Sequence, residues 1–177
     1  MPQHYYIDTD YLQSYIFMKN HLLKKFLSKK NSDEEKTRSE NFQDIIFNKN
    51  REIFIKIPFI VFGELFNNIN NYHASFDENC ISSINNEIFS LFDRNNVDLV
   101  PPEKKSYSLA NEIIQKDSRF DSTDALIVSQ SLIDKNSVFM ATMDYTITES
   151  FGGGIIARIN DRLYNNKERF KKLKIYG

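Results

Sequence analysis

Cysteine, histidine and tryptophan are scarce in this chain of 177 residues, which contains one, three and none of them. The single Cys80 excludes an internal disulfide and a metal site rich in thiolates. The histidines His4, His21 and His73 are too far apart in the sequence to suggest a zinc site. Disulfide scaffolding and zinc chemistry are therefore not expected.

Excess charge of either sign is also missing, because 23 Lys+Arg face 24 Asp+Glu and the formal net charge is −1. This balance excludes binding of nucleic acid through overall positive charge, so any basic surface must be local. Two basic clusters are candidates for such a surface. They are Lys24, Lys25, Lys29 and Lys30, and Lys171, Lys172 and Lys174. Each cluster taken alone is also typical of a solvated helix face or tail.

Long hydrophobic runs are absent, since no apolar stretch approaches the ~20 residues that a bilayer-spanning helix needs. Met1 leads into a short apolar segment without a basic region or cleavage site, so we expect no signal peptide. The length is that of one ordinary domain. We therefore expect a single cytoplasmic domain over residues 1–177, without a membrane partner, carrying a charged, exposed insertion at about 29–51.

Short apolar runs alternate with segments of helical spacing along most of the chain. The runs predict strands at 5–7, 53–57, 97–100 and 137–143, and a final edge strand at 155–158. Helices are predicted at about 10–28, 58–70, 77–95, 103–116 and 122–134. Strands separated by helices indicate an α/β fold: a three-layer α/β/α sandwich with a central, mostly parallel sheet of four to five strands.

Acidic residues follow two of the predicted strands. Asp8 and Asp144 each stand where an apolar strand ends, and a parallel sheet brings both to the same edge. A single acid at such a position is also typical of a turn or a helix N-cap. Two of them on one edge need a cation or a retained proton.

A third acid, Asp124, lies between Ile127 and Val128 on a helical wheel and so points with the apolar stripe toward the sheet. An ionised carboxylate in that position is costly unless it is paired or bound to a metal. Asp121, three residues earlier, either joins this group or caps the helix.

Glu64 is open to two interpretations. The apolar stripe of its helix leaves Glu64 on the other side, as expected of a solvated residue. The preceding turn, 59–62, is apolar all round and is predicted to be buried on every face, so that Glu64 would emerge just beyond it. Periodicity alone leaves both interpretations open.

Four segments, in this order, resemble the PIN domain family of small nucleases, which includes the VapC-type toxins. They are Tyr6–Asp10, Ile57–Leu65, Ser122–Ile127 and Ala141–Asp144, and they span most of the chain. The resemblance implies that Asp8, Glu64, Asp124 and Asp144 hold Mg²⁺ or Mn²⁺ and hydrolyse RNA phosphodiester bonds. It also makes Thr142 a match to a small hydroxyl residue of the family. Family members are often homodimers, and toxins of the type pair with an antitoxin.

The chain departs from the family pattern in three places. Asp10 stands where the family commonly has Asn, and it adds a fifth carboxylate or caps the helix. After Asp144 the sequence is Tyr145-Thr146-Ile147, where the family often has an acid and then Phe. The stretch between Asp8 and Glu64 is longer than in compact toxins. These departures bear on subfamily and substrate more than on fold.

Two other functions compete with this one. Asp8-Thr9-Asp10 after an apolar strand resembles the nucleophile loop of haloacid-dehalogenase-type phosphatases, in which the first Asp is phosphorylated. That family has a glycine-containing flap soon after the loop, whereas no glycine lies between Asp10 and Gly63. A catalytically inactive PIN-like binding module is the other alternative, and the presence of all four acids argues against it.

Overall fold

The structure is a computed structural model, and it describes residues 2–24, 32–47, 52–71, 76–142, 144–164 and 174–176. At its centre lies a parallel sheet of five strands in the order β3-β2-β1-β4-β5. The strands are β1 (Gln3–Ile7), β2 (Ile53–Pro58), β3 (Val97–Val100), β4 (Ser137–Ala141) and β5 (Lys174–Tyr176). The chain moves outward from β1 to β3 and then returns to the other side of β1. The gap between β1 and β4 is therefore the topological switch point, where parallel sheets place their ligand sites.

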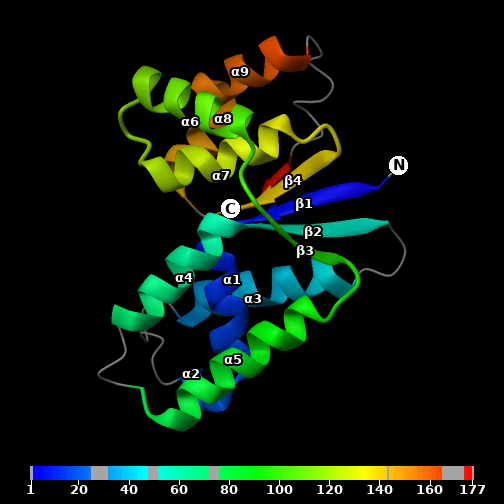
Figure 1. Ribbon diagram of the computed structural model, residues 1–177, viewed down its shortest axis with the longest axis vertical. Coiled ribbons are helices and arrows are strands. Elements are labelled where there is room, and N and C mark those ends of the chain that lie inside the picture. Colours follow the sequence, from blue (N-terminus) through cyan, green and yellow to red (C-terminus); the bar gives the residue numbers. More distant parts are fainter. Residues whose placement is uncertain are drawn as a thin grey trace.

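Helices cover both faces of the sheet, which confirms the predicted three layers (Figure 1). One layer consists of α1 (Thr9–Lys19), α2 (His21–Lys24), α3 (Ser32–Phe47), α4 (Phe59–Asn71) and α5 (Glu78–Phe92). The other consists of α6 (Lys104–Lys116), α7 (Ser122–Ile133), α8 (Tyr145–Gly153) and α9 (Ile155–Tyr164). None of the helices that the structure describes has the length and apolar character needed to span a bilayer.

The two central strands read as nearly continuous apolar runs because helices bury them on both sides. In β4, Phe139, Met140 and Ala141 are all buried, and in β1 the last residue, Ile7, is completely buried. Acidic residues then set where the following helices begin. The Asp77 side chain accepts a hydrogen bond from the Cys80 amide at the start of α5, as expected of an N-cap.

The prediction of an edge strand at 155–158 is wrong, because these residues form the first turn of α9. Ile155, Ile156 and Ile159 are buried, and this spacing is that of one helix face rather than of a strand. The fifth strand is instead β5, in the basic tail, where it pairs in parallel with β4. A run of three apolar residues, Ile155 to Ala157, is too short to separate the two kinds of structure by itself.

The expectation that the charged segment is simply exposed is also wrong in part. Residues 32–47 form α3, which packs against α1. Phe42 is completely buried, and its ring lies edge-on to Tyr15 with 4.7 Å between the ring centroids. The helix predicted at 10–28 is interrupted at Asn20, whose side chain accepts a hydrogen bond from the Leu22 amide and begins α2.

Candidate active site at the carboxyl end of the sheet

Asp8, the first of the predicted site residues, lies directly after β1 and is only 6% exposed. Its amide donates to the Ala141 carbonyl at 3.0 Å, which fixes the end of β1 beside the end of β4. Its Oδ1 accepts from the Thr9 amide and its Oδ2 from the Thr142 hydroxyl, both at 2.7 Å. Burial raises the pKa of this carboxyl to about 6, and these two hydrogen bonds offset part of the effect.

Thr142 connects Asp8 to the second strand-terminal acid. The Thr142 hydroxyl is completely buried, donates to Asp8 and accepts from the Asp144 amide at 3.1 Å. The Oδ1 of Asp144 accepts from the Ile147 amide at 2.8 Å and caps α8. Asp144 is therefore a helix cap and, at the same time, part of the edge that carries Asp8.

Asp124 lies in the first turn of α7 and is partly exposed. Its pKa is raised to about 7, first by burial and then by the negative charges of Asp121, Asp8, Asp144 and Glu64. The four predicted acids are therefore close enough to repel one another. Asp121 caps α7, since its Oδ1 accepts from the amides of Thr123 and Asp124 at 2.8 and 2.9 Å.

Glu64 reaches the same edge from α4. Its Oε2 accepts a hydrogen bond of 2.5 Å from the hydroxyl of Thr9, which is itself buried. The expectation that the preceding turn is buried on every face is wrong, because Phe59 is 53% exposed. The apolar face of α4 instead carries Val61, Leu65 and Ile69 into the core.

Sequence reasoning missed Thr9, which joins two of the acids by donating to Glu64 from its hydroxyl and to Asp8 from its amide. Its position was a usable signal. A hydroxyl residue that follows a strand-terminal acid lies in the first turn of the next helix, where its side chain faces the same edge.

The remaining candidates lie farther from this group. Asp10 forms an ion pair with Arg38 of α3, with 3.5 Å between the charged atoms, and contributes to the raised pKa of Asp8. Lys24 is exposed in α2, beyond the far end of α1, a helix about 16 Å long. Lys174 lies in β5. The residues Lys25, Lys29, Lys30, Lys171 and Lys172 lie outside the described part of the chain.

The donor atoms at this edge fit a hard divalent cation, because carboxylate and hydroxyl oxygens are the ligands that Mg²⁺ and Mn²⁺ prefer. Within the described ranges, no three Asp, Glu, His or Cys side chains converge closely enough to hold a metal ion by themselves. Mg²⁺ is commonly bound by only one or two carboxylates together with several waters. The donor set therefore fits this ion without a closed protein cage.

The sheet order, the helical layers and the acids at the switch point define an α/β protein with a PIN-like fold. No family model matches the sequence, and no curated protein matches it. Among solved structures, the chain is similar to a chain in the crystal structure of VapBC2 from Rickettsia felis bound to a DNA fragment from their promoter. The match has a TM-score of 0.53 and 15% identity, and it covers 83% of this chain and 92% of the other. It shows a shared fold with a chain of that structure.

Proposed function

We propose that this protein is a Mg²⁺- or Mn²⁺-dependent endoribonuclease that hydrolyses RNA phosphodiester bonds. The observation that carries the proposal is the buried carboxylate of Asp8, which faces three further acids at the switch point. In the part of the chain that the structure describes, neither Lys nor Arg pairs with Asp8, Glu64, Asp124 or Asp144. Such a group of acids needs a cation to be ionised together.

Each acid has a role that its hydrogen bonds support. Asp8 and Asp144 would hold the metal, because Thr142 and the amides around it fix their orientation at the ends of β1 and β4. A bound divalent ion supplies positive charge to the phosphate and lowers the pKa of a water ligand. Glu64, fixed by Thr9, would orient the attacking water.

Asp124 is suited to accept a proton from that water. Burial and the neighbouring acids raise its pKa to about 7 in the metal-free protein, so its carboxyl has a higher proton affinity than an ordinary aspartate. Its position at the start of α7, less restricted by hydrogen bonds than Asp8, leaves it room to take the proton at a carboxylate oxygen.

Replacement of Asp8 tests this proposal most simply. We expect Asp8→Asn to abolish Mn²⁺-dependent cleavage of RNA while circular dichroism shows an intact fold. The matched control is Asp33→Asn, which changes an exposed acid on α3 and leaves cleavage unchanged. Cleavage at the wild-type rate by Asp8→Asn would refute the assignment, and hydrolysis of a generic aryl phosphate in place of RNA would favour the phosphatase alternative.

We further propose that the protein is the toxin of a toxin–antitoxin pair. The similarity to a chain of a VapBC2 complex supports this role. Expression of the protein alone should then arrest growth, and expression of a small protein encoded beside it should relieve the arrest. If cells grow normally at high expression of the unaltered, folded protein, this result argues for a role in RNA processing.

A further inference from the structure

A line of three hollows follows α6, on the layer of the molecule opposite α1 to α5. The first, about 390 Å³, lies between Lys116 of α6 and Arg158 and Arg162 of α9. The second, about 240 Å³, shares Arg162 with the first and adds Lys105. The third, about 380 Å³, shares Lys105 with the second and reaches Lys135. Because each hollow shares a basic side chain with the next, the three lie next to one another along α6, and we call this row of hollows the α6 track.

The α6 track is basic in a chain whose net charge is −1. Its lining includes six cationic side chains, Lys56, Lys105, Lys116, Lys135, Arg158 and Arg162. Three acids accompany them, Glu103, Glu112 and Asp134. The lining of the track therefore has three more cationic side chains than acidic ones.

Existing ion pairs occupy only some of these cations. Glu112 holds both Lys116 and Arg162, with contacts of 2.6 Å to each. Lys56 pairs with Asp98. Lys105, Lys135 and Arg158 are exposed and, among the residues described, have no acidic partner. These three cations, spread over the whole track, are available to an anionic ligand.

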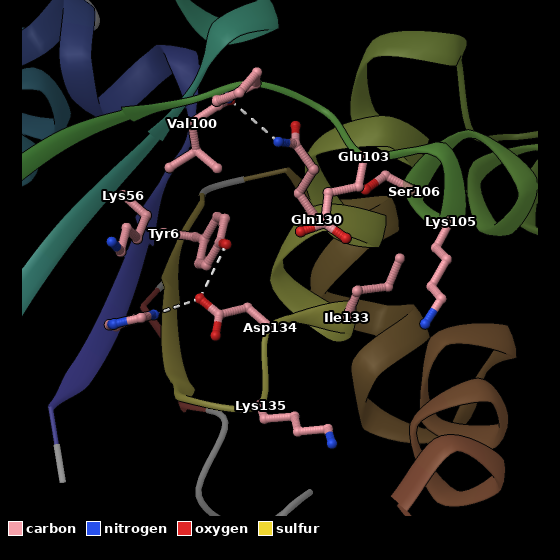
Figure 2. A pocket seen from close by; sticks show the side chains of 12 residues that line it. Tyr6, Lys56, Val100, Glu103, Lys105, Ser106, Gln130, Ile133, Asp134 and Lys135 are labelled. Atoms are coloured by element: carbon pink, nitrogen blue, oxygen red, sulfur yellow. Dashed lines mark hydrogen bonds and ion pairs between the residues drawn. The ribbon is translucent and has the colours of Figure 1, made fainter.

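Figure 2 shows the third hollow in detail. Lys105 extends from α6 and Lys135 from the turn that follows α7, while Lys56 lies across the hollow on the strand side. The apolar side chains of the lining include Val100 at the end of β3 and Ile133 at the end of α7. The second hollow adds a more open apolar surface, because Leu163 of α9 is 42% exposed. Cations beside apolar surfaces, repeated along a line, are the pattern of a site for a chain that alternates phosphates with apolar bases.

A short loop joins one end of the track to the helix that carries Asp124. Lys116 ends α6, and only residues 117–121 separate it from α7, whose first turn carries Asp124. The other end of the track lies near Asp134, ten residues along α7 from Asp124 and thus about 15 Å away. An RNA strand bound at the acids would therefore reach the α6 track by crossing the loop of residues 117–121.

We propose that the α6 track binds a single strand of RNA, holding the part of the substrate that extends beyond the cleavage site. This inference rests on the proposed function, because the strand is the substrate of the acids. Lys105 and Arg158 contact phosphates, and the apolar surfaces receive bases. Phosphate contacts of this kind position a strand without selecting its sequence.

The experiment compares two double variants in an Asp8→Asn background, so that the RNA stays intact. Binding of a labelled single-stranded RNA is measured over a range of salt concentrations. Each phosphate contact with a single strand contributes about 0.7 to the slope of log affinity against log salt. We expect Lys105→Ala/Arg158→Ala to reduce that slope by about 1.4. The matched control, Lys19→Ala/Lys36→Ala, removes two exposed cations from the other layer and leaves the slope unchanged.

An unchanged slope in Lys105→Ala/Arg158→Ala, or an equal reduction in both double variants, would overturn the inference. Binding of poly-glutamate as tightly as RNA, weakened alike by the variant, would also overturn it and indicate an acidic protein as the ligand. A separate measurement, cleavage of RNA by the unaltered protein, tests the proposed function. If the unaltered protein cleaves RNA but the double variant does not change RNA binding, the inference about the track fails and the nuclease assignment stands. If the unaltered protein does not cleave RNA, the nuclease assignment itself fails.

Discussion

Two clusters centred on an aspartate lie along β1, one beside its first half and one just beyond its end. The hydrogen bonds that these two aspartates accept differ. Beside the first half, Asp134 accepts from His4 at 2.5 Å, from Tyr6 at 3.1 Å and from the Asn136 amide at 2.9 Å. Beyond the end of the strand, Asp8 accepts from one threonine hydroxyl and one amide and faces other acids.

The difference separates an acid whose charge is compensated by donors from one whose charge is not. Asp134 ties β1 to the end of α7 and raises the pKa of Tyr6, whose largest cause is burial. Its neighbours are donors that compensate its charge. Asp8 and Asp124 instead have raised pKa values because their surroundings do not compensate theirs. Negative charge that no donor or cation compensates favours the binding of a cation at the switch point.

The largest expected effect is a pH dependence of stability that a metal removes. In the folded protein the pKa of Asp8 is about 6 and that of Asp124 about 7, both above the ordinary 3.8. Stability that depends on these protons is fully present below about pH 3.8 and is lost as pH rises through about 6 and about 7. Asp8 accounts for about 3 kcal/mol of the loss. Urea unfolding at several pH values measures it.

Addition of Mn²⁺ at about 100 times its Kd should restore about 2.7 kcal/mol at neutral pH. The control is the same urea unfolding in buffer without divalent ions. A free energy of unfolding that rises steadily from pH 4 to pH 7 without metal would show that the charge of Asp8 is compensated after all.

Removal of the compensated acid should have the next largest effect. Asp134→Ala leaves the Tyr6 hydroxyl and the His4 ring without their acceptor inside the protein, which costs about 2 kcal/mol. Thermal or urea unfolding measures the loss, and the affinity for Mn²⁺ below the melting temperature should not change. A stability equal to that of the unaltered protein would remove the contrast between the two clusters.

Removal of the uncompensated acid should act in the opposite direction. Asp8→Asn eliminates a buried charge and should stabilise the metal-free protein by about 1 to 2 kcal/mol at neutral pH. The same urea series measures it, with Asp33→Asn as the control. Destabilisation by Asp8→Asn would place Asp8 among the structural acids.

The smallest effect on stability is expected from the residue that joins the acids. Thr9→Val removes the hydroxyl that donates to Glu64 and should cost about 1 kcal/mol. Its effect on cleavage should be larger, because Glu64 then loses its orientation. Thr9→Ser keeps the hydroxyl and should retain most activity, and equal activity in the two variants would exclude this role.

Much of this arrangement was predictable because it depends on local patterns. The apolar runs at 53–57, 97–100 and 137–143 predicted the strands β2, β3 and β4, and the parallel sheet then required Asp8 and Asp144 to share an edge. The wrong assignments have physical causes. The charges of α3 concealed the buried face of Phe42, and a short apolar run concealed the helical spacing of α9.

Other features depend on contacts between distant parts of the chain. Nothing near Glu64 in the sequence indicates the Thr9 hydroxyl, which is 55 residues away and turns a residue opposite the apolar stripe into part of the site. The α6 track likewise joins α6 to α9 through side chains that are about 50 residues apart, such as Glu112 and Arg162. Periodicity within one helix does not contain this information.

Calorimetric titration with Mn²⁺ at neutral pH tests the central claim most directly, because it measures whether the acids at the end of β1 and β4 attract a divalent ion. The account predicts binding to the unaltered protein, and loss of that binding in Asp8→Asn but not in Asp134→Ala. Absence of binding to the unaltered protein, or equal affinity in Asp8→Asn, would contradict it.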